Sequence, residues 1–318
     1  MTPPRSAYSV YELLPKWLLG WPPAGLLVSL CLFLAATPSA FADTRDIQSR
    51  WVSAISADNV SVLRALLDES NAVDADGANE NKTANANVAP LWTLTASNGK
   101  TALMVASKVG DVALAKRLVD LGSNIQDRTI TNGTAFMFAV LGDQTSIAQW
   151  LVGLGADINA KGSNGWTSVM IASAKGLDGT LGWLLSEGAN AQTPDVYGFS
   201  PLMRAADNGH AEAVRLLLGK DVPAGDDTNA DTGLVDVHWQ DELENTALHY
   251  AVAGSYQDIV QLLLDADADV KIKNRAGLSA LDMAISTVND AKDSAVNRSV
   301  KQDQKALLEI LQRFDKSG

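Results

Sequence analysis

The residues best suited to chemistry lie in one acidic stretch of the chain. Asp227, Asn229 and Asp231 have the D-x-N-x-D spacing by which a calcium loop presents oxygen ligands to the ion. The rest of the pattern departs from such a loop: Gly233 comes one place late, and His238 stands where a bidentate glutamate is expected. Two interpretations stay open, a solvated acidic loop, which these departures favour, and a weak calcium site.

The other residue types that carry chemistry are few. The chain has three histidines and one cysteine, Cys31, and no glycine-rich phosphate loop or nucleophile elbow. Zinc needs three or four ligands, so the isolated His238 is a poor metal site. We therefore expect no enzymatic activity, no cofactor and no small-molecule substrate.

Composition narrows the class of partner. Hydrophobic residues make up 47% of the 318-residue chain, which is enough for a folded core, and the formal net charge is −12. Such a charge repels phosphate backbones, so nucleic acid is a poor partner. A basic protein, or a basic patch on one, would be attracted instead.

The N-terminus resembles an export signal. Arg5 and Lys16 precede a 13-residue apolar run at 24–36, and Ala40-Phe41-Ala42 follows. That run is shorter than the roughly 20 residues needed to span a bilayer. A basic start, a short apolar segment and a small-x-small exit are typical of a secretory signal peptide. We expect residues 1–42 to be removed before Asp43 and the mature chain to be periplasmic or secreted; an uncleaved membrane anchor is the alternative.

The elements that must position any site follow from a repeat. A Thr or Ser recurs at intervals of 33, 33, 33, 46 and 33 residues, and an alanine lies five places after each one. A leucine lies twelve places after most of these alanines. Small and apolar positions in this register predict pairs of helices that stack on the next pair and share one core. The series are Thr101, Thr134, Thr167, Ser200, Thr246 and Ser279; Ala106, Ala139, Ala172, Ala205, Ala251 and Ala284; and Leu118, Leu151, Leu184, Leu217 and Leu263.

The residues that carry the period resemble the ankyrin repeat, whose core reads T-P-L-H-x-A. Ser200 to Ala205 (SPLMRA) and Thr246 to Ala251 (TALHYA) are close copies. The resemblance implies an all-α solenoid of about seven helix-turn-helix repeats with finger loops over residues 43–318. We place the repeats near 47–70, 98–130, 131–163, 164–196, 197–221, 242–273 and 274–314, with insertions near 71–97, 222–240 and 287–300.

The resemblance also implies where a partner would bind. Ankyrin stacks grip proteins on the concave face, which the fingers and first helices form. Two interpretations of the aromatic finger residues stay open: contact with a partner, or packing of one finger on the next. The partner-binding positions that we expect are Trp166, Lys175, Val196, Tyr197, Phe199, Asn208, Glu242 and Leu243.

The function expected from these features is that of an exported, non-catalytic scaffold that binds a protein. The alternatives are a calcium-responsive module that uses the insertion 222–240, and an accessory protein that supports an exported enzyme.

Overall fold

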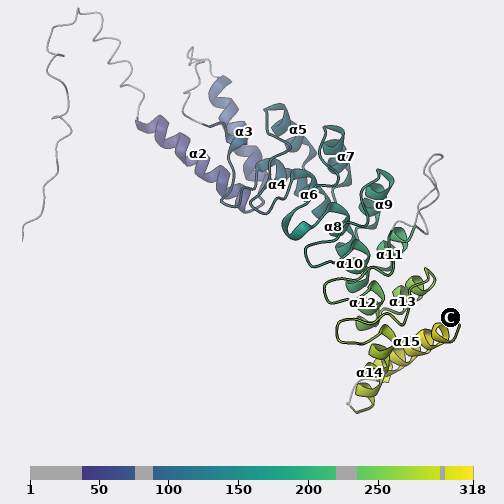
Figure 1. Cartoon of the computed structure of the whole chain (residues 1–318). Coiled ribbons are helices and arrows are strands. Elements are labelled where there is room, and N and C mark those ends of the chain that lie inside the picture. Colours follow the sequence, from purple (N-terminus) through teal and green to yellow (C-terminus); the bar gives the residue numbers. More distant parts are fainter. Residues whose placement is uncertain (1–37, 76–88, 220–234, 294–297, 318) are drawn as a thin grey trace, which may run out of the picture. The chain divides into compact units, whose positions relative to one another are not determined.

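The computed structural model describes residues 38–75, 89–219, 235–293 and 298–317, in two units, residues 1–50 and 51–318 (Figure 1). Helix α2 (Pro38–Ser56) begins in the first unit, so the expected cleavage site before Asp43 lies in its first turns. None of the helices in the described part of the chain combines the length and the apolar content that crossing a membrane requires.

The described part of residues 51–318 forms a stack of helix pairs. Their first helices pack in one row, with α4 on α6, α6 on α8, α8 on α10 and α10 on α12, and the second helices form another row (Figure 1). The helices are α3 (Val60–Ala75), α4 (Ala102–Val109), α5 (Val112–Asp120), α6 (Ala135–Leu141), α7 (Thr145–Gly153), α8 (Ser168–Lys175), α9 (Asp178–Ser186), α10 (Pro201–Asp207), α11 (Ala211–Leu217), α12 (Ala247–Ala253), α13 (Gln257–Leu264), α14 (Ala280–Asp293) and α15 (Arg298–Ser317). The expected all-α repeat fold is confirmed within the described residues.

The recurring residues explain why each helix pair forms. In five of the six first helices that follow a finger, the hydroxyl at the start accepts a hydrogen bond from the backbone N–H three places on, as Thr101 does from Met104 at 3.2 Å and Ser200 from Met203 at 3.3 Å. At the start of α12 the Thr246 hydroxyl is bonded to the His249 ring instead. This cap satisfies one of the unpaired amides of the first turn. The recurring alanines and leucines are all completely buried, because neighbouring pairs approach closely at these positions.

Two expected insertions are shorter than the sequence suggested. The stretch expected as an insertion at 71–97 is helical as far as Ala75, because no proline or glycine interrupts α3 before Gly77. After residues 76–88, which lie outside the described residues, a short helical turn, η3 (Leu91–Thr93), buries Leu91.

The insertion expected at 222–240 ends earlier than predicted, because residues 235–240 belong to a regular loop. Asp236 accepts a hydrogen bond from the His238 amide at 2.9 Å, as Asn190 does from the Gln192 amide one repeat earlier. The His238 ring reaches the Asp267 carbonyl of the next repeat at 3.0 Å. This histidine, unexplained by the sequence, joins two repeats. In the last pair the extra residues lengthen α14 and α15 on both sides of residues 294–297.

Candidate protein-binding face

Six-residue hairpins precede the first helices, and we call them fingers 1 to 6: residues 96–101, 129–134, 162–167, 195–200, 241–246 and 274–279. In each, the amide of the first residue donates to the carbonyl of the fifth, for example Asp195 to Phe199 at 3.0 Å. We call the side of the stack formed by the fingers and the first helices the finger face.

The fingers are also joined to one another at their tips. The second residue of a finger donates to the carbonyl of the third residue in the preceding finger: Ile130 to Asn98 at 2.9 Å, Val196 to Asn164 at 2.8 Å, Glu242 to Tyr197 at 3.1 Å and Arg275 to Leu243 at 2.9 Å. Among the described residues, the equivalent bond from Ser163 to Thr131 is missing. The ribbon of fingers is therefore interrupted between finger 2 and finger 3.

Finger 4 is held by a buried ion pair. The Asp195 carboxylate, whose side chain is fully buried, accepts hydrogen bonds from the amides of Tyr197 and Phe199 at 2.9 and 3.0 Å. Its other oxygen accepts from the guanidinium of Arg204 in α10 at 2.5 Å. The buried carboxylate thus has the donors that offset its lost hydration.

Finger 5 is also held by a buried carboxylate, but a different side chain donates to it. The Asp241 carboxylate accepts from the amides of Leu243 and Asn245 at 2.8 and 2.9 Å, and from the hydroxyl of Tyr250 in α12. Tyr250 stands at the repeat position of Arg204. Burial and the hydrogen bond to Asp241 raise the pKa of the Tyr250 phenol well above its usual range, so the phenol stays a donor.

Finger 3 has neither member of this pair. Gly162 stands at the position of Asp195 and Asp241, and Ile171 stands at the position of Arg204 and Tyr250. Without a side chain at Gly162, the tip forms a tighter turn in which Asn164 and Gly165 both have positive φ, 55° and 80°. A Cβ at Gly162 would lie 2.8 Å from the Met137 methyl group, so the absence of a side chain also makes room for Met137.

A pocket of about 460 Å³ occupies this interruption. Fingers 2 and 3 form two of its walls, and α6 and α8 form its floor. Its apolar lining includes Met137, Phe138, Leu141, Trp166 and Ile171, and Lys175 lies at its edge.

The aromatic finger residues pack against side chains of the first helices. The Arg204 guanidinium carbon lies 5.0 Å from the ring centre of Trp166 and 3.9 Å from that of Phe199. The Phe199 ring of finger 4 also lies 5.1 Å from the ring of Tyr250 in α12. Phe199 thus packs between two first helices, whereas Trp166 both stacks on Arg204 and lines the pocket.

The other expected partner-binding residues are on the surface. Val196 and Tyr197 at the tip of finger 4, and Glu242 and Leu243 at the tip of finger 5, are exposed and adjacent through the Glu242–Tyr197 backbone bond. Asn208 caps the C-terminus of α10, and its side-chain amide donates to the Arg204 carbonyl at 2.8 Å. The structure thus gathers Trp166 with Lys175, and the four tip residues with one another.

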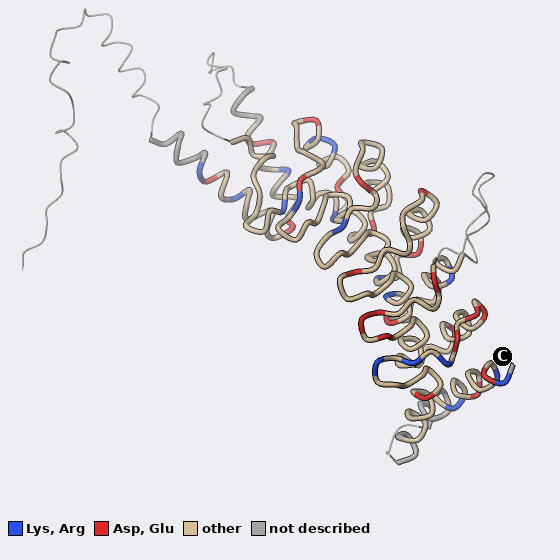
Figure 2. Tube along the Cα trace, in the orientation of Figure 1, with Lys and Arg blue, Asp and Glu red and all other residues tan. Residues whose placement is uncertain are grey.

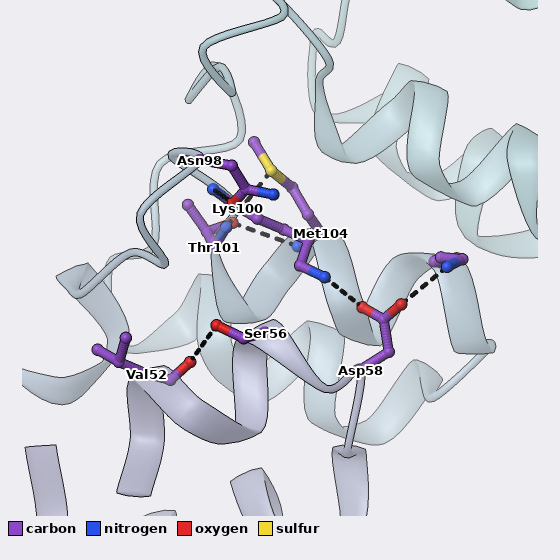
Figure 3. A network of polar contacts seen from close by, with 8 residues as sticks. Val52, Ser56, Asp58, Asn98, Lys100, Thr101 and Met104 are labelled. Atoms are coloured by element: carbon purple, nitrogen blue, oxygen red, sulfur yellow. Dashed lines mark hydrogen bonds and ion pairs between the residues drawn. The ribbon is translucent and has the colours of Figure 1, made fainter. Parts of the chain in front are cut away.

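Finger 1 has a polar anchor of a different kind. The Asp58 carboxylate, in the turn after α2, accepts from the buried Lys100 ammonium at 2.7 Å and from Lys108 at 2.8 Å (Figure 3). Burial opposes ionisation of Asp58, but the two lysines outweigh it and lower its pKa below the ordinary value. The first helix pair is thereby tied to the finger that follows it.

Sequence reasoning missed the floor of the pocket. Met137, Phe138, Leu141 and Ile171 look like ordinary core residues when read one repeat at a time. A comparison of the first residue of each finger would have shown that finger 3 begins with Gly162, whereas fingers 4 to 6 begin with Asp or Asn.

The histidines and acidic residues in the described part of the chain form no metal site. No group of three or more His, Cys, Asp or Glu there could hold a metal ion. The calcium candidates Asp227, Asn229 and Asp231 lie outside the described residues. His249 is buried, bonded to Thr246 and to the Leu278 carbonyl, and burial lowers its pKa, which fits a neutral structural imidazole.

Comparison with known proteins agrees with the geometry. The chain matches ankyrin repeats described as three copies over residues 54–162 and 136–232, and ankyrin repeats described as many copies over residues 230–284. No curated protein matches the chain. The matched segments cover more than half of the sequence and coincide with the stacked helix pairs and their fingers, and the chain therefore belongs to the ankyrin-repeat family.

Proposed function

We propose that this protein is a non-catalytic scaffold that binds a partner protein on its finger face. Ankyrin repeats typically mediate protein–protein interaction. The observation that carries the proposal is where apolar side chains are exposed. Of the ten large hydrophobic side chains that are exposed among the described residues, five are in fingers: Ile130, Val196, Tyr197, Leu243 and Leu278.

Three of these exposed side chains lie together at the tips of fingers 4 and 5. Val196, Tyr197 and Leu243 are each more than half exposed. Such apolar clusters ringed by polar groups are typical of interaction sites. Exposed acidic residues lie beside them on finger 5 (red in Figure 2). These are Glu242 and Glu244, and Glu244 also forms an ion pair with Arg275 of finger 6 at 3.8 Å. A partner with an apolar patch flanked by basic residues fits this part of the face.

Paired substitutions at the finger tips test the proposal. Tyr197→Ser with Leu243→Ser removes exposed apolar area without touching the core, so folding should be unaffected. Gln149→Ser with Ser186→Ala, at exposed positions of the second helices α7 and α9, is the matched control. The tip variant should recover at least about tenfold less partner by affinity purification from the native compartment, with quantitative mass spectrometry. Equal recovery by wild type and the tip variant would reject binding at these tips.

We also propose that the protein is exported, with residues 1–42 as its signal peptide. The basic start, the short apolar run and the Ala-Phe-Ala exit support this. Mass spectrometry of the protein from the extracytoplasmic fraction should find Asp43 at the N-terminus. An intact chain in that fraction would favour an anchor, and its presence in the cytoplasm alone would reject export.

A further inference from the structure

We propose that the pocket between fingers 2 and 3 binds one aromatic side chain of the partner, which carries a carboxylate beside that ring. The inference rests on the proposed function and names the partner chemistry for one part of the finger face. It is carried by the apolar lining, by Lys175, and by the way in which the chain fills the same space in its next two repeats.

The neighbouring repeats show what kind of group fits. Between fingers 3 and 4 the side chain of Arg204 enters from α10 and lies over the rings of Trp166 and Phe199. Between fingers 4 and 5 the ring of Tyr250 enters from α12 and packs 5.1 Å from Phe199. A flat group thus occupies each of these positions from within the chain.

Between fingers 2 and 3 the chain provides no such group. Ile171, at the position of Arg204 and Tyr250, is too short to cross the gap and forms part of the floor instead. The resulting pocket of about 460 Å³ has two aromatic rings in its lining, Phe138 and Trp166. Aromatic rings pair favourably with other aromatic rings in edge-to-face or offset contact. An aromatic side chain from outside is therefore the complement of this lining.

The positive charge of Lys175 at the pocket predicts which residue lies next to the aromatic residue in the partner. Lys175 is exposed at the end of α8, and it is the one charged residue among those that line the pocket. No acidic side chain lines the pocket, and no described residue forms an ion pair with Lys175. A carboxylate one or two residues from the partner's aromatic ring would meet this ammonium.

This preference differs from that of fingers 4 and 5. There Glu242 is exposed, and Glu244 forms an ion pair with Arg275 of finger 6 at 3.8 Å, so a basic group is expected beside Glu242. The partner segment should therefore present an aromatic residue and a carboxylate to finger 3, and basic residues toward finger 5. The order of these features fixes the direction in which the segment lies on the face.

Selection of peptides on the full chain tests the proposal. The probe is a random peptide library displayed on phage, and individual winners are then titrated as synthetic peptides. Pocket-directed peptides should share an aromatic residue with Asp or Glu within two positions. Their affinity should fall at least about tenfold for Gly162→Asp with Ile171→Arg, which rebuilds the internal pair of finger 4.

Two further variants keep the result decisive if the rebuilt pair destabilises the fold. Lys175→Glu changes one exposed charge and should replace Asp or Glu by Lys or Arg in the selected peptides. Lys161→Glu, at an exposed position outside the pocket lining, is the matched charge control and should leave the selected motif unchanged.

The outcomes separate this proposal from the proposed function. Aromatic–acidic peptides that respond to Lys175→Glu support the pocket. Peptides that bind the rebuilt variant as tightly as wild type, but are lost on Leu243→Ser, overturn the pocket and leave the finger face as the binding site. Peptides that tolerate both changes overturn both.

Discussion

Fingers 3 and 4 are successive copies of one hairpin, and they differ in how their tips are held. Finger 4 folds around a buried carboxylate, Asp195, which Arg204 neutralises, and its tip is bonded to finger 3. Finger 3 has Gly162 and Ile171 at the same positions, and among the described residues its tip has no backbone bond to finger 2. Two residues thus convert a closed junction between repeats into an open, apolar one.

The difference shows how a repeat fold separates stability from recognition. The caps, alanines and leucines that build the stack are the same at both junctions. What differs is the Asp195–Arg204 ion pair, which holds the tip of finger 4 and has no counterpart in finger 3. A solenoid can therefore vary its surface one junction at a time without changing the core that its neighbours share.

The largest effect is expected from removing the anchor of finger 4. Asp195→Ala leaves the Arg204 guanidinium partly buried without its counter-charge and two backbone amides without an acceptor. The free energy of unfolding should fall by about 3 kcal/mol, the cost of breaking a buried pair. Urea denaturation followed by circular dichroism measures it. Gly162→Ala, at the matching position of finger 3, should cost about 1 kcal/mol or less, because the Met137 methyl group can move aside.

Equal losses of unfolding free energy for the two substitutions would show that the Asp195 carboxylate does not hold finger 4. The proposed difference between fingers 3 and 4 would then be wrong.

Tyr250→Phe tests whether finger 5 works as finger 4 does. The change removes the hydroxyl donor of the Asp241 carboxylate and should cost about 1–2 kcal/mol. The folded-state pKa of Tyr250 lies above the ordinary value of 10.0, so above that pH the unfolded chain ionises first and wild-type stability falls. Thermal unfolding from pH 9 to 11 should show a smaller fall for Tyr250→Phe. Equal pH slopes would contradict the assignment, and Tyr197→Phe, at an exposed ring, is the control.

Acid should loosen finger 1 through Asp58. The two lysines lower the folded-state pKa of Asp58 below 3.8, so the ion pairs stabilise the fold above that pH and the stabilisation is lost as the pH falls through the folded-state value. Because these groups are partly exposed, we expect about 1 kcal/mol or less. Thermal unfolding at pH 6 and pH 3 should show a smaller acid loss for Asp58→Asn than for wild type. An equal fall in thermal stability between pH 6 and pH 3 for Asp58→Asn and wild type would show that Asp58 does not contribute to the acid sensitivity.

The smallest effect concerns a single amide. Ser163 N–H has no acceptor among the described residues, whereas the matching amides of Val196 and Glu242 are bonded to the preceding fingers. Hydrogen exchange followed by NMR should be at least about tenfold faster at Ser163 than at these two amides. Similar protection at all three would mean that the ribbon continues across the pocket.

The sequence was informative where a residue has the same task in every repeat. The capping hydroxyls, the alanines and the leucines could be predicted because each recurs at one spacing and meets its own copy in the next repeat. The extent of α3 and the place of residues 235–240 were predicted wrongly. Asp236 could have been recognised as the counterpart of Asn190, since both accept the same local hydrogen bond.

The pocket could not be read from single positions. It depends on Gly162 and Ile171 together, and on the space that Arg204 and Tyr250 fill elsewhere. The sequence leaves two interpretations of Phe199 open, and its ring packs against Arg204 and Tyr250. All the expected partner-binding roles stay predictions: those of Trp166, Lys175, Val196, Tyr197, Phe199, Asn208, Glu242 and Leu243.

Site-specific photo-crosslinking tests the central claim, binding of a protein on the finger face, most directly. A photoreactive amino acid is placed at Tyr197 or Leu243 on the finger tips, or at Gln149 or Ser186 on the second helices, all of which are exposed. In the native compartment, the two tip positions should crosslink to the same protein and the two helix positions should not. Crosslinks to that protein from Gln149 and Ser186 alone would contradict the account.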